Sequence, residues 1–166
     1  LDEAAYDESF DEEGSGRAIG SREGVPLLDV WFADGTHGLA VGAYGLLLRT
    51  ADGGKTWSDA SDGVSNPEGW HFNAIAGDAR SGVVLIAGEK GTLYRSADGG
   101  QTFTPSRSPY DGSFFGAAIG ADDAFYVFGL QGSLFRSSDR GAAWTRLDAG
   151  VSSGLHDACR TADGKL

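Results

Sequence analysis

Cysteine, proline and long apolar runs are scarce in this chain, and the scarcity of each limits the class of protein to which it can belong. One of the 166 residues is a cysteine, so no disulfide can form within the chain and the redox compartment stays undecided. No run approaches the ~20 apolar residues that span a bilayer. The first residues also lack the basic and apolar regions of a signal peptide. Four prolines against 27 glycines are typical of a protein built from many short strands and tight turns.

Basic residues are also few, with 13 Lys and Arg against 24 Asp and Glu and a formal net charge of −11. This balance argues against nucleic acid as a partner, because its phosphates would be repelled. Many of the acidic residues lie among the first thirteen positions, and the stretch that follows has no clear apolar period. We interpret residues 1–24 as an acidic, flexible leader, with a docking segment that folds on a partner as the alternative.

The chain repeats one short motif three times. The motif has the pattern Ser/Thr-x-Asp-Gly-Gly-x-Thr-aromatic, and the third copy departs from it at Arg140 and Ala143. Its aspartates are Asp52, Asp98 and Asp139, and its aromatic residues are Trp57, Phe103 and Trp144. The interval between copies matches the ~40–50 residues of a four-stranded propeller blade. An aspartate at a turn accepts hydrogen bonds from the following backbone, and the aromatic ring packs on the hairpin, so the motif is interpreted as structural.

Each copy is preceded by a Gly-x-x-Gly turn and a short apolar strand that ends in arginine. The arginines are Arg49, Arg95 and Arg136. Two further apolar strands precede each turn, and a fourth, outer strand follows each motif from its aromatic residue onward. Four short strands joined by hairpins predict a meander blade, so the fold class is all-β and the architecture a β-propeller. The predicted blades are residues 25–65, 66–107 and 108–149, with an incomplete fourth at 150–166.

These motifs resemble the Asp-box, or BNR, repeats of sialidases, some glycoside hydrolases, sortilin-type receptors and the photosystem II stability/assembly factor family. The Gly-x-x-Gly-x-Leu-x-Arg-Ser/Thr-x-Asp-Gly-Gly-x-Thr-Trp run is most similar to the last of these, over roughly residues 25–166. The resemblance implies a propeller of typically seven blades, a periplasmic or otherwise exported location, and a role as an assembly or stability factor acting with a membrane complex.

Three blades and the beginning of a fourth do not close a ring, because propellers have about four to eight blades. An open arc exposes an apolar blade face and unpaired strand edges. The chain is therefore either a fragment of a longer protein or an arc whose copies associate. We favour a fragment and expect it to self-associate when isolated.

A binding surface is expected where the Gly-x-x-Gly turns meet the crossings between blades, on the face opposite the Asp-boxes. Chemically varied residues stand there on a repeated frame, which is how a propeller makes a site. The predicted partner-binding residues are Tyr44, Trp70, His71, Lys90, Tyr110 and Gln131. Each has an ordinary alternative: Trp70 could fill the channel or begin the core of the next strand, His71 could be a satisfied turn residue, and the two tyrosines could be plain surface residues.

The three repeated arginines have two interpretations. A guanidinium group can hold an anionic partner with its fork of donors, or it can bind carbonyl groups or a carboxylate in the next blade. Because the arginines recur in register with the Asp-box, the structural role is favoured over anion binding.

Catalysis is the weaker hypothesis. Glycoside hydrolases generally need two positioned carboxylates, and no candidate lies in a recognisable catalytic setting; the candidates are Asp29, Asp34, Glu68, Glu89 and Asp111. The three histidines are scattered, Cys159 has no cysteine partner, and no motif predicts a metal or a cofactor. We predict a non-enzymatic, protein-binding propeller segment. The alternatives are a glycoside hydrolase, sialidase-like or sugar-binding Asp-box propeller, and an arc that only completes a larger ring.

Overall fold

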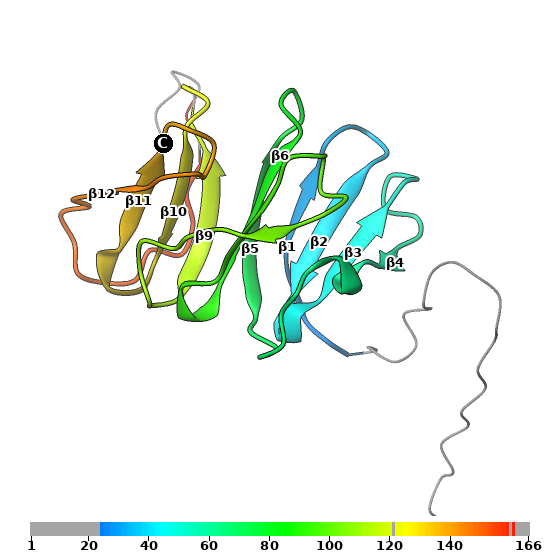
Figure 1. The fold of residues 1–166 in the computed structure, drawn as a ribbon, viewed down its shortest axis with the longest axis horizontal. Helices are drawn as coiled ribbons and strands as arrows, with labels where there is room; N and C mark the ends of the chain where they lie inside the picture. Colours follow the sequence, from blue (N-terminus) through cyan, green and yellow to red (C-terminus); the bar gives the residue numbers. More distant parts are fainter. Residues whose placement is uncertain (1–23, 121, 160, 162–166) are drawn as a thin grey trace, which may run out of the picture.

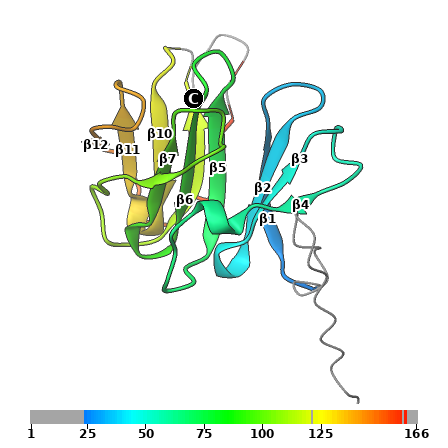
Figure 2. The same ribbon diagram turned by 45° about the vertical axis from the view of Figure 1, so that its right-hand side comes forward.

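The structure, a computed structural model, describes residues 24–120, 122–159 and 161. The predicted acidic leader therefore lies almost wholly outside the described residues. The twelve strands form three four-stranded antiparallel sheets, β1–β4, β5–β8 and β9–β12, in which each strand pairs with its neighbour in sequence. Figure 1 shows the three sheets side by side in chain order, and the turned view in Figure 2 keeps the same order. The all-β, partial-propeller prediction is confirmed.

Each sheet is one blade, and its strands follow the predicted positions closely. Blade 1 contains β1 (Leu27–Phe32), β2 (Gly38–Gly42), β3 (Leu47–Thr50) and β4 (Ser58–Asp59). Blade 2 contains β5 (Phe72–Asp78), β6 (Val83–Gly88), β7 (Leu93–Ser96) and β8 (Thr104–Pro105). Blade 3 contains β9 (Phe114–Ile119), β10 (Phe125–Gly129), β11 (Leu134–Ser137) and β12 (Thr145–Leu147). The outer strands begin one residue later than predicted, because the Asp-box aromatic residue belongs to the turn.

The incomplete fourth blade predicted at residues 150–166 has no strand in the part of the chain that the structure describes. Residues 151–159 contain no strand. A strand needs a partner to pair with, and here the segment instead contacts blade 3. The Leu155 N–H donates to the Gly129 carbonyl over 2.9 Å, and the His156 ring stacks on Phe115 with centroids 4.6 Å apart. Of the last part of this predicted blade, residues 160–166, the structure describes only Thr161.

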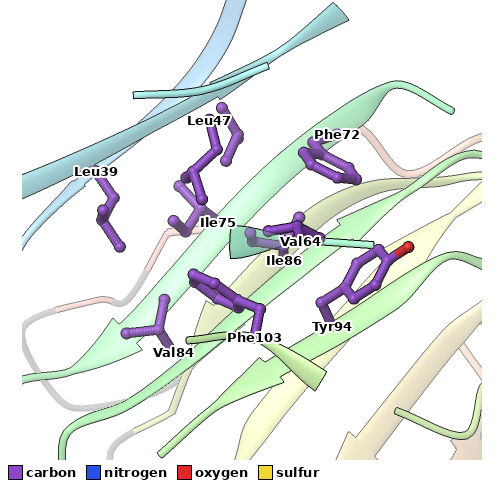
Figure 3. Packing of buried hydrophobic residues seen from close by; sticks show 10 residues of the cluster. Leu39, Leu47, Val64, Phe72, Ile75, Val84, Ile86, Tyr94 and Phe103 are labelled. Carbon is purple, nitrogen blue, oxygen red and sulfur yellow. The ribbon is translucent and has the colours of Figure 1, made fainter. Parts of the chain in front are cut away.

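The core lies between blades as layers of apolar side chains. We call the side of a blade that meets the following blade its rear face and the side that meets the preceding blade its front face. Leu39 and Leu47 on the rear face of blade 1 pack against Phe72, Ile75 and Ile86 on the front face of blade 2, as Figure 3 shows. Burial of each such side chain contributes about 1.5–3 kcal/mol, so the blade contacts carry much of the stability.

The Asp-box aromatic residue belongs to the front face of its blade. Phe103 packs in the layer between blades 1 and 2, and Trp144 contacts both apolar clusters between blades 2 and 3. The blades therefore stack with one polarity: each rear face receives the Asp-box side of the next blade.

The two glycines of each Gly-x-x-Gly turn serve different needs. The second, exemplified by Gly45, has φ +73°, as expected of a tight hairpin. The first has an extended backbone, with φ −160° at Gly88, so a positive φ is not the reason for glycine there. A Cβ atom at Gly88 would instead lie 2.1 Å from the His71 carbonyl oxygen. The residue before the second glycine adopts the left-handed conformation in every copy, at Tyr44, Lys90 and Gln131.

Candidate functional site

The Gly-x-x-Gly turns and the crossings between blades form one face of the arc. Within a blade, strand direction places the β2–β3 turn on the side opposite the β1–β2 turn and the Asp-box, and Figure 1 shows these turns along the lower edge. Backbone hydrogen bonds join turn to crossing. The Glu89 N–H donates to the His71 carbonyl over 3.1 Å, and the Gly91 N–H donates to the Gly112 carbonyl over 2.8 Å. The turn tips are thereby held on a rigid frame.

Tyr44 and His71 meet at the joint between blades 1 and 2. Their rings lie edge to face with centroids 4.8 Å apart, and 67% of Tyr44 is exposed. The His71 backbone N–H donates to Glu89 Oε2 over 2.9 Å, and the His71 Nδ1 atom lies 3.9 Å from Glu89 Oε1. The cluster of Tyr44, His71 and Glu89 therefore presents a phenol, an imidazole and a carboxylate side by side. Glu89 was not among the predicted partner-binding residues, although it stands next to Lys90 in the same turn.

Trp70 is half-buried in a crossing loop that Asn66 closes. The Asn66 side-chain amide donates to the Trp70 carbonyl over 2.9 Å, and the Trp70 N–H donates to Asn66 Oδ1 over 3.1 Å. Lys90 and Gln131 are exposed at the tips of their turns, as Tyr44 is. Their left-handed backbone costs conformational energy, and each is held there by the turn that it shares with two glycines.

Tyr110 is placed differently from the other predicted residues. Its ring is half-buried in the layer between blades 2 and 3, with centroids 5.9 Å from both Phe114 and Phe135. The phenol oxygen lies 3.4 Å from the Leu130 carbonyl. Tyr110 thus packs as part of the blade contact, which is the kind of role that spacing alone could not separate from a surface role.

A hollow of about 340 Å³ opens beside the turn of blade 3. It is lined by residues of the β10–β11 turn and of the segment from β12 into the following crossing, namely Gln131, Gly132, Arg146, Leu147, Asp148, Ala149 and Val151. Gln131 is the predicted site residue that lines it, so the structure places Gln131 apart from the Tyr44 cluster, at the other end of the arc.

Two of the three repeated arginines bind the following blade. Arg49 Nη2 donates to the Gly100 carbonyl over 2.6 Å, and Arg95 Nε donates to the Arg140 carbonyl over 2.7 Å. Both carbonyls belong to the Asp-box of the next blade. This is the favoured structural interpretation, and it commits these guanidinium groups to backbone oxygens.

Arg136, the third member, binds within its own blade. It pairs with Asp122 and donates from Nε to the Tyr126 hydroxyl over 3.2 Å. The neighbouring carboxylate and hydroxyl raise the pKa of Arg136 further above its ordinary value. Anion binding by the three arginines as an array is still a prediction; their groups contact separate oxygen atoms in the structure.

The Asp-box carboxylates are acceptors for the turns that they close. Asp98 accepts from the Ser96 hydroxyl, from the Thr102 hydroxyl over 2.7 Å, and from the Gln101 and Thr102 N–H groups. Burial raises the pKa of Asp98, but these hydrogen bonds outweigh it and lower the pKa to about 2. The carboxylate is thus ionised at neutral pH and serves the fold.

The third Asp-box has lost one hydrogen bond of this set. Asp139 accepts from the Ala143 and Ala142 N–H groups and from the Ser137 hydroxyl, but position 143 has no hydroxyl to offer. The pKa of Asp139 is lowered by these bonds. Arg140 takes φ +59°, a conformation that the second box gives to Gly99. The third turn therefore has one side-chain hydrogen bond fewer than the second and holds a non-glycine residue at positive φ.

The candidate catalytic carboxylates are mostly engaged in structural hydrogen bonds. Burial raises the pKa of Asp29, whose two oxygens accept from the Ile75 and Val30 N–H groups. The His37 and Thr36 backbone groups bind Asp34 and hold its pKa far below the ordinary value. Within the described part of the chain, no group of three or more histidine, cysteine, aspartate or glutamate side chains could hold a metal ion. The same residues include no helix long and apolar enough to cross a membrane.

Comparison with known proteins assigns the family. The family model described as photosynthesis system II assembly factor YCF48 matches residues 19–165. The chain belongs to the photosystem II assembly factor YCF48 family. A photosystem II assembly lipoprotein Ycf48 from Parasynechococcus marenigrum (strain WH8102) is 33% identical over 82% of this chain. The chain spans 41% of the length of that relative.

Solved structures agree on the fold. The structure described as YCF48 bound to D1 peptide superposes with a TM-score of 0.72 and 24% identity, over 84% of this chain and 46% of that chain. An ancestral GH74 enzyme superposes less well, with a TM-score of 0.57 and 16% identity over 73% of this chain and 18% of that chain. At these identities the similarity shows shared propeller architecture alone. The predicted resemblance to the assembly factor family is confirmed by the YCF48 family match.

Proposed function

We propose that this chain is a non-enzymatic, protein-binding propeller segment of an assembly factor that acts with a membrane complex. The observation that carries the proposal is the cluster of an exposed Tyr44 with half-buried His71 and Glu89, on the face where turns and crossings meet. Membership of the YCF48 family supports it. A relative in that family has been solved with a D1 peptide, so an extended segment of a photosystem II subunit is the class of partner proposed here.

The face suits a protein segment because the turn backbone that carries its side chains is fixed before binding. Tyr44 and Lys90 stand on left-handed turn tips that the neighbouring glycines and crossings hold. Binding therefore does not have to order the backbone of these turns, which favours affinity. Tyrosine combines a broad apolar ring with a polar hydroxyl and is enriched among residues that dominate binding energy. Glu89 and Lys90 add opposite charges, which would set the register of a peptide.

The proposal that the chain does not catalyse glycoside hydrolysis has support from the carboxylates. Both oxygens of Asp29 and the Oδ1 atom of Asp34 accept hydrogen bonds from backbone N–H groups, and Glu89 accepts from the His71 N–H group. A hydrolase needs two carboxyl groups directed at one bond, ~5–9.5 Å apart. Release of sugar from a glycoside by the purified chain, abolished by replacing one carboxylate, would contradict this part of the proposal.

The proposal places the protein outside the cytoplasm, in the periplasm or an equivalent exported compartment. The support is that the similar cyanobacterial proteins are named lipoproteins. Self-association of the open arc also stays a prediction.

Glycine substitutions at the turn tips test the binding face without straining it. Tyr44→Gly and Lys90→Gly remove a side chain at a backbone conformation that glycine prefers, so loss of binding would not reflect a damaged turn. Arg140→Gly is the matched control, because Arg140 has the same positive φ on the opposite, Asp-box side. The probe is a set of overlapping fluorescent peptides that cover the D1 protein, with binding read by anisotropy.

The expected result is at least a tenfold loss of affinity in Tyr44→Gly, since truncation of a dominant tyrosine costs about 2 kcal/mol or more. Arg140→Gly should bind within about twofold of the wild-type chain. No saturable binding by any peptide, or equal binding by all three variants, would overturn the proposal that this face recognises D1.

A further inference from the structure

The repeat builds the turn face with the same backbone frame at both joints between described blades. At the joint between blades 1 and 2, the Glu89 N–H donates to the His71 carbonyl over 3.1 Å. At the joint between blades 2 and 3, the Leu130 N–H donates to the Ser113 carbonyl over 3.0 Å. Because the backbone is alike, a difference in what the two joints bind must come from their side chains.

The side chains at equivalent positions of the two joints differ in chemical character. The first joint combines an aromatic ring, an imidazole and a carboxylate, in Tyr44, His71 and Glu89. The equivalent residues of the second joint carry an ammonium group, a hydroxyl group and an aliphatic chain, in Lys90, Ser113 and Leu130. At these three positions, the first joint alone joins an aromatic ring to a negative charge.

The carboxylate of Glu89 is held by one oxygen and keeps capacity at the other. Oε2 accepts from the His71 N–H over 2.9 Å, which fixes the direction of the carboxylate. Oε1 lies 3.9 Å from His71 Nδ1, too far for a hydrogen bond, and 35% of the Glu89 side chain is exposed. An ionised carboxylate accepts about four hydrogen bonds, so Oε1 can accept from a donor that arrives from outside.

The ring of Tyr44 stands on the other side of the same imidazole. Its centroid lies 4.8 Å from that of His71 in edge-to-face geometry, and 67% of the residue is exposed. The face of an aromatic ring carries negative potential and attracts a cation within about 6 Å of its centroid. The formal charge of −11 on the whole chain adds a long-range attraction for cations. Ring and carboxylate together therefore favour a positively charged ligand group.

We propose that the cluster of Tyr44, His71 and Glu89 binds an arginine side chain of the partner segment. The inference rests on the proposed function and names the kind of residue that this part of the face recognises. A guanidinium group is planar, so its edge can donate to Glu89 Oε1 while its face covers the Tyr44 ring. The ammonium group of lysine is a compact and strongly hydrated charge without such a face. His71 is a positioning residue, because its N–H orients the carboxylate and its ring contacts Tyr44.

NMR titrations of the full chain with a single blocked amino acid test this site without any D1 sequence. The probe is Nα-acetyl-arginine methylamide, and its neutral isostere is Nα-acetyl-citrulline methylamide. The readouts are the ring signals of Tyr44 and the ring and amide signals of His71. Glu89→Gln removes the charge and keeps an oxygen that can accept from the His71 N–H. Glu68→Gln is the matched control, because it removes the same charge from an exposed residue of the crossing into blade 2.

The arginine probe should bind at least about threefold more tightly than the citrulline probe, with a lysine probe between them. Glu89→Gln and Tyr44→Gly should each weaken arginine binding about threefold or more, as expected for an exposed ion pair and an exposed cation–π contact. Glu68→Gln should leave it unchanged. Circular dichroism checks folding, and Tyr44→Asn, which tolerates the left-handed backbone, replaces the glycine variant if that is unfolded.

Two results would overturn the inference. One is equal shifts with the arginine and citrulline probes. The other is an equal loss in Glu89→Gln and Glu68→Gln, because that result indicates a general negative field and no local site. The D1 peptide assay is a separate test: selective arginine binding without any D1 binding would retain this site and overturn the D1 proposal. Saturable D1 binding with equal arginine and citrulline shifts would do the reverse.

Discussion

Replacing Gly88 by alanine tests the assignment of the first turn glycine to a steric requirement. The backbone of Gly88 is extended, with φ −160°, so alanine meets no conformational penalty there. Its Cβ atom, however, would lie 2.1 Å from the His71 carbonyl oxygen and 3.2 Å from the His71 carbonyl carbon. Because these are main-chain atoms, no side-chain rotation relieves the clash, and the start of β5 must move.

The size of the effect follows from what that movement disrupts. Overpacking of a close contact costs about 1–3 kcal/mol. The Glu89 N–H to His71 carbonyl hydrogen bond, 3.1 Å long, contributes about 0.5–1.5 kcal/mol more if it is lost. The reduced freedom of the unfolded chain returns about 0.4–1 kcal/mol. The net loss spans about 0.5–4 kcal/mol and is centred near 2 kcal/mol, which is equivalent to a fall in Tm of about 4–8 °C for a domain of this size.

The assay is thermal unfolding followed by circular dichroism, with Gly69→Ala as the control. Gly69 has φ +67° and no atom within 4 Å of an added Cβ, so its substitution should cost only the left-handed conformational energy, about 1–2 kcal/mol. Gly88→Ala should be the more destabilised of the two. A Gly88→Ala protein with a Tm within about 2 °C of wild type would show that the close approach to His71 is not a constraint on this turn.

Two further predictions concern the arginines and the Asp-boxes. Arg95→Ala should lower the free energy of unfolding by about 1.5–3 kcal/mol, because it removes a charge-assisted hydrogen bond to the Arg140 carbonyl between blades. Arg136→Ala should lower it by less than about 1 kcal/mol, because it breaks a surface ion pair. Equal losses for the two variants in urea titrations would contradict this prediction. The pKa values of Asp52 and Asp98 are lowered from 3.8 to about 2, so the stability that they provide is present above about pH 4 and is lost as the pH falls through about 2. Asp98→Asn should accordingly flatten the fall in Tm between pH 4 and 2, and an unchanged acid profile would count against this role.

The candidate site shows which roles can be inferred from sequence and which cannot. Exposed residues at the tips of repeated turns, such as Tyr44, Lys90 and Gln131, could be selected because the Gly-x-x-Gly pattern locates the tip by itself. Tyr110 could not be assigned, because an aromatic residue in a crossing packs inward or outward according to neighbours that are distant in sequence. Glu89 was not predicted as a binding residue for a related reason. Its carboxylate joins the cluster through a hydrogen bond from the His71 N–H group, and only the folded turn brings the two within 2.9 Å.

The four-stranded blade could be predicted from the amino-acid sequence. Local patterns encode it completely: strand alternation, glycine-dependent turns and an Asp-box whose donors all lie within four residues of the aspartate. The contacts between blades could be seen only in the tertiary structure. Whether Arg49 and Arg95 held anions or carbonyls depended on a turn about fifty residues away, and the need for Gly88 depended on a close approach to His71 across the sheet. The same long-range geometry leaves the front face of blade 1 exposed while its counterparts are buried, because burial depends on which blade stands next to a surface, and identical repeats differ in their neighbours.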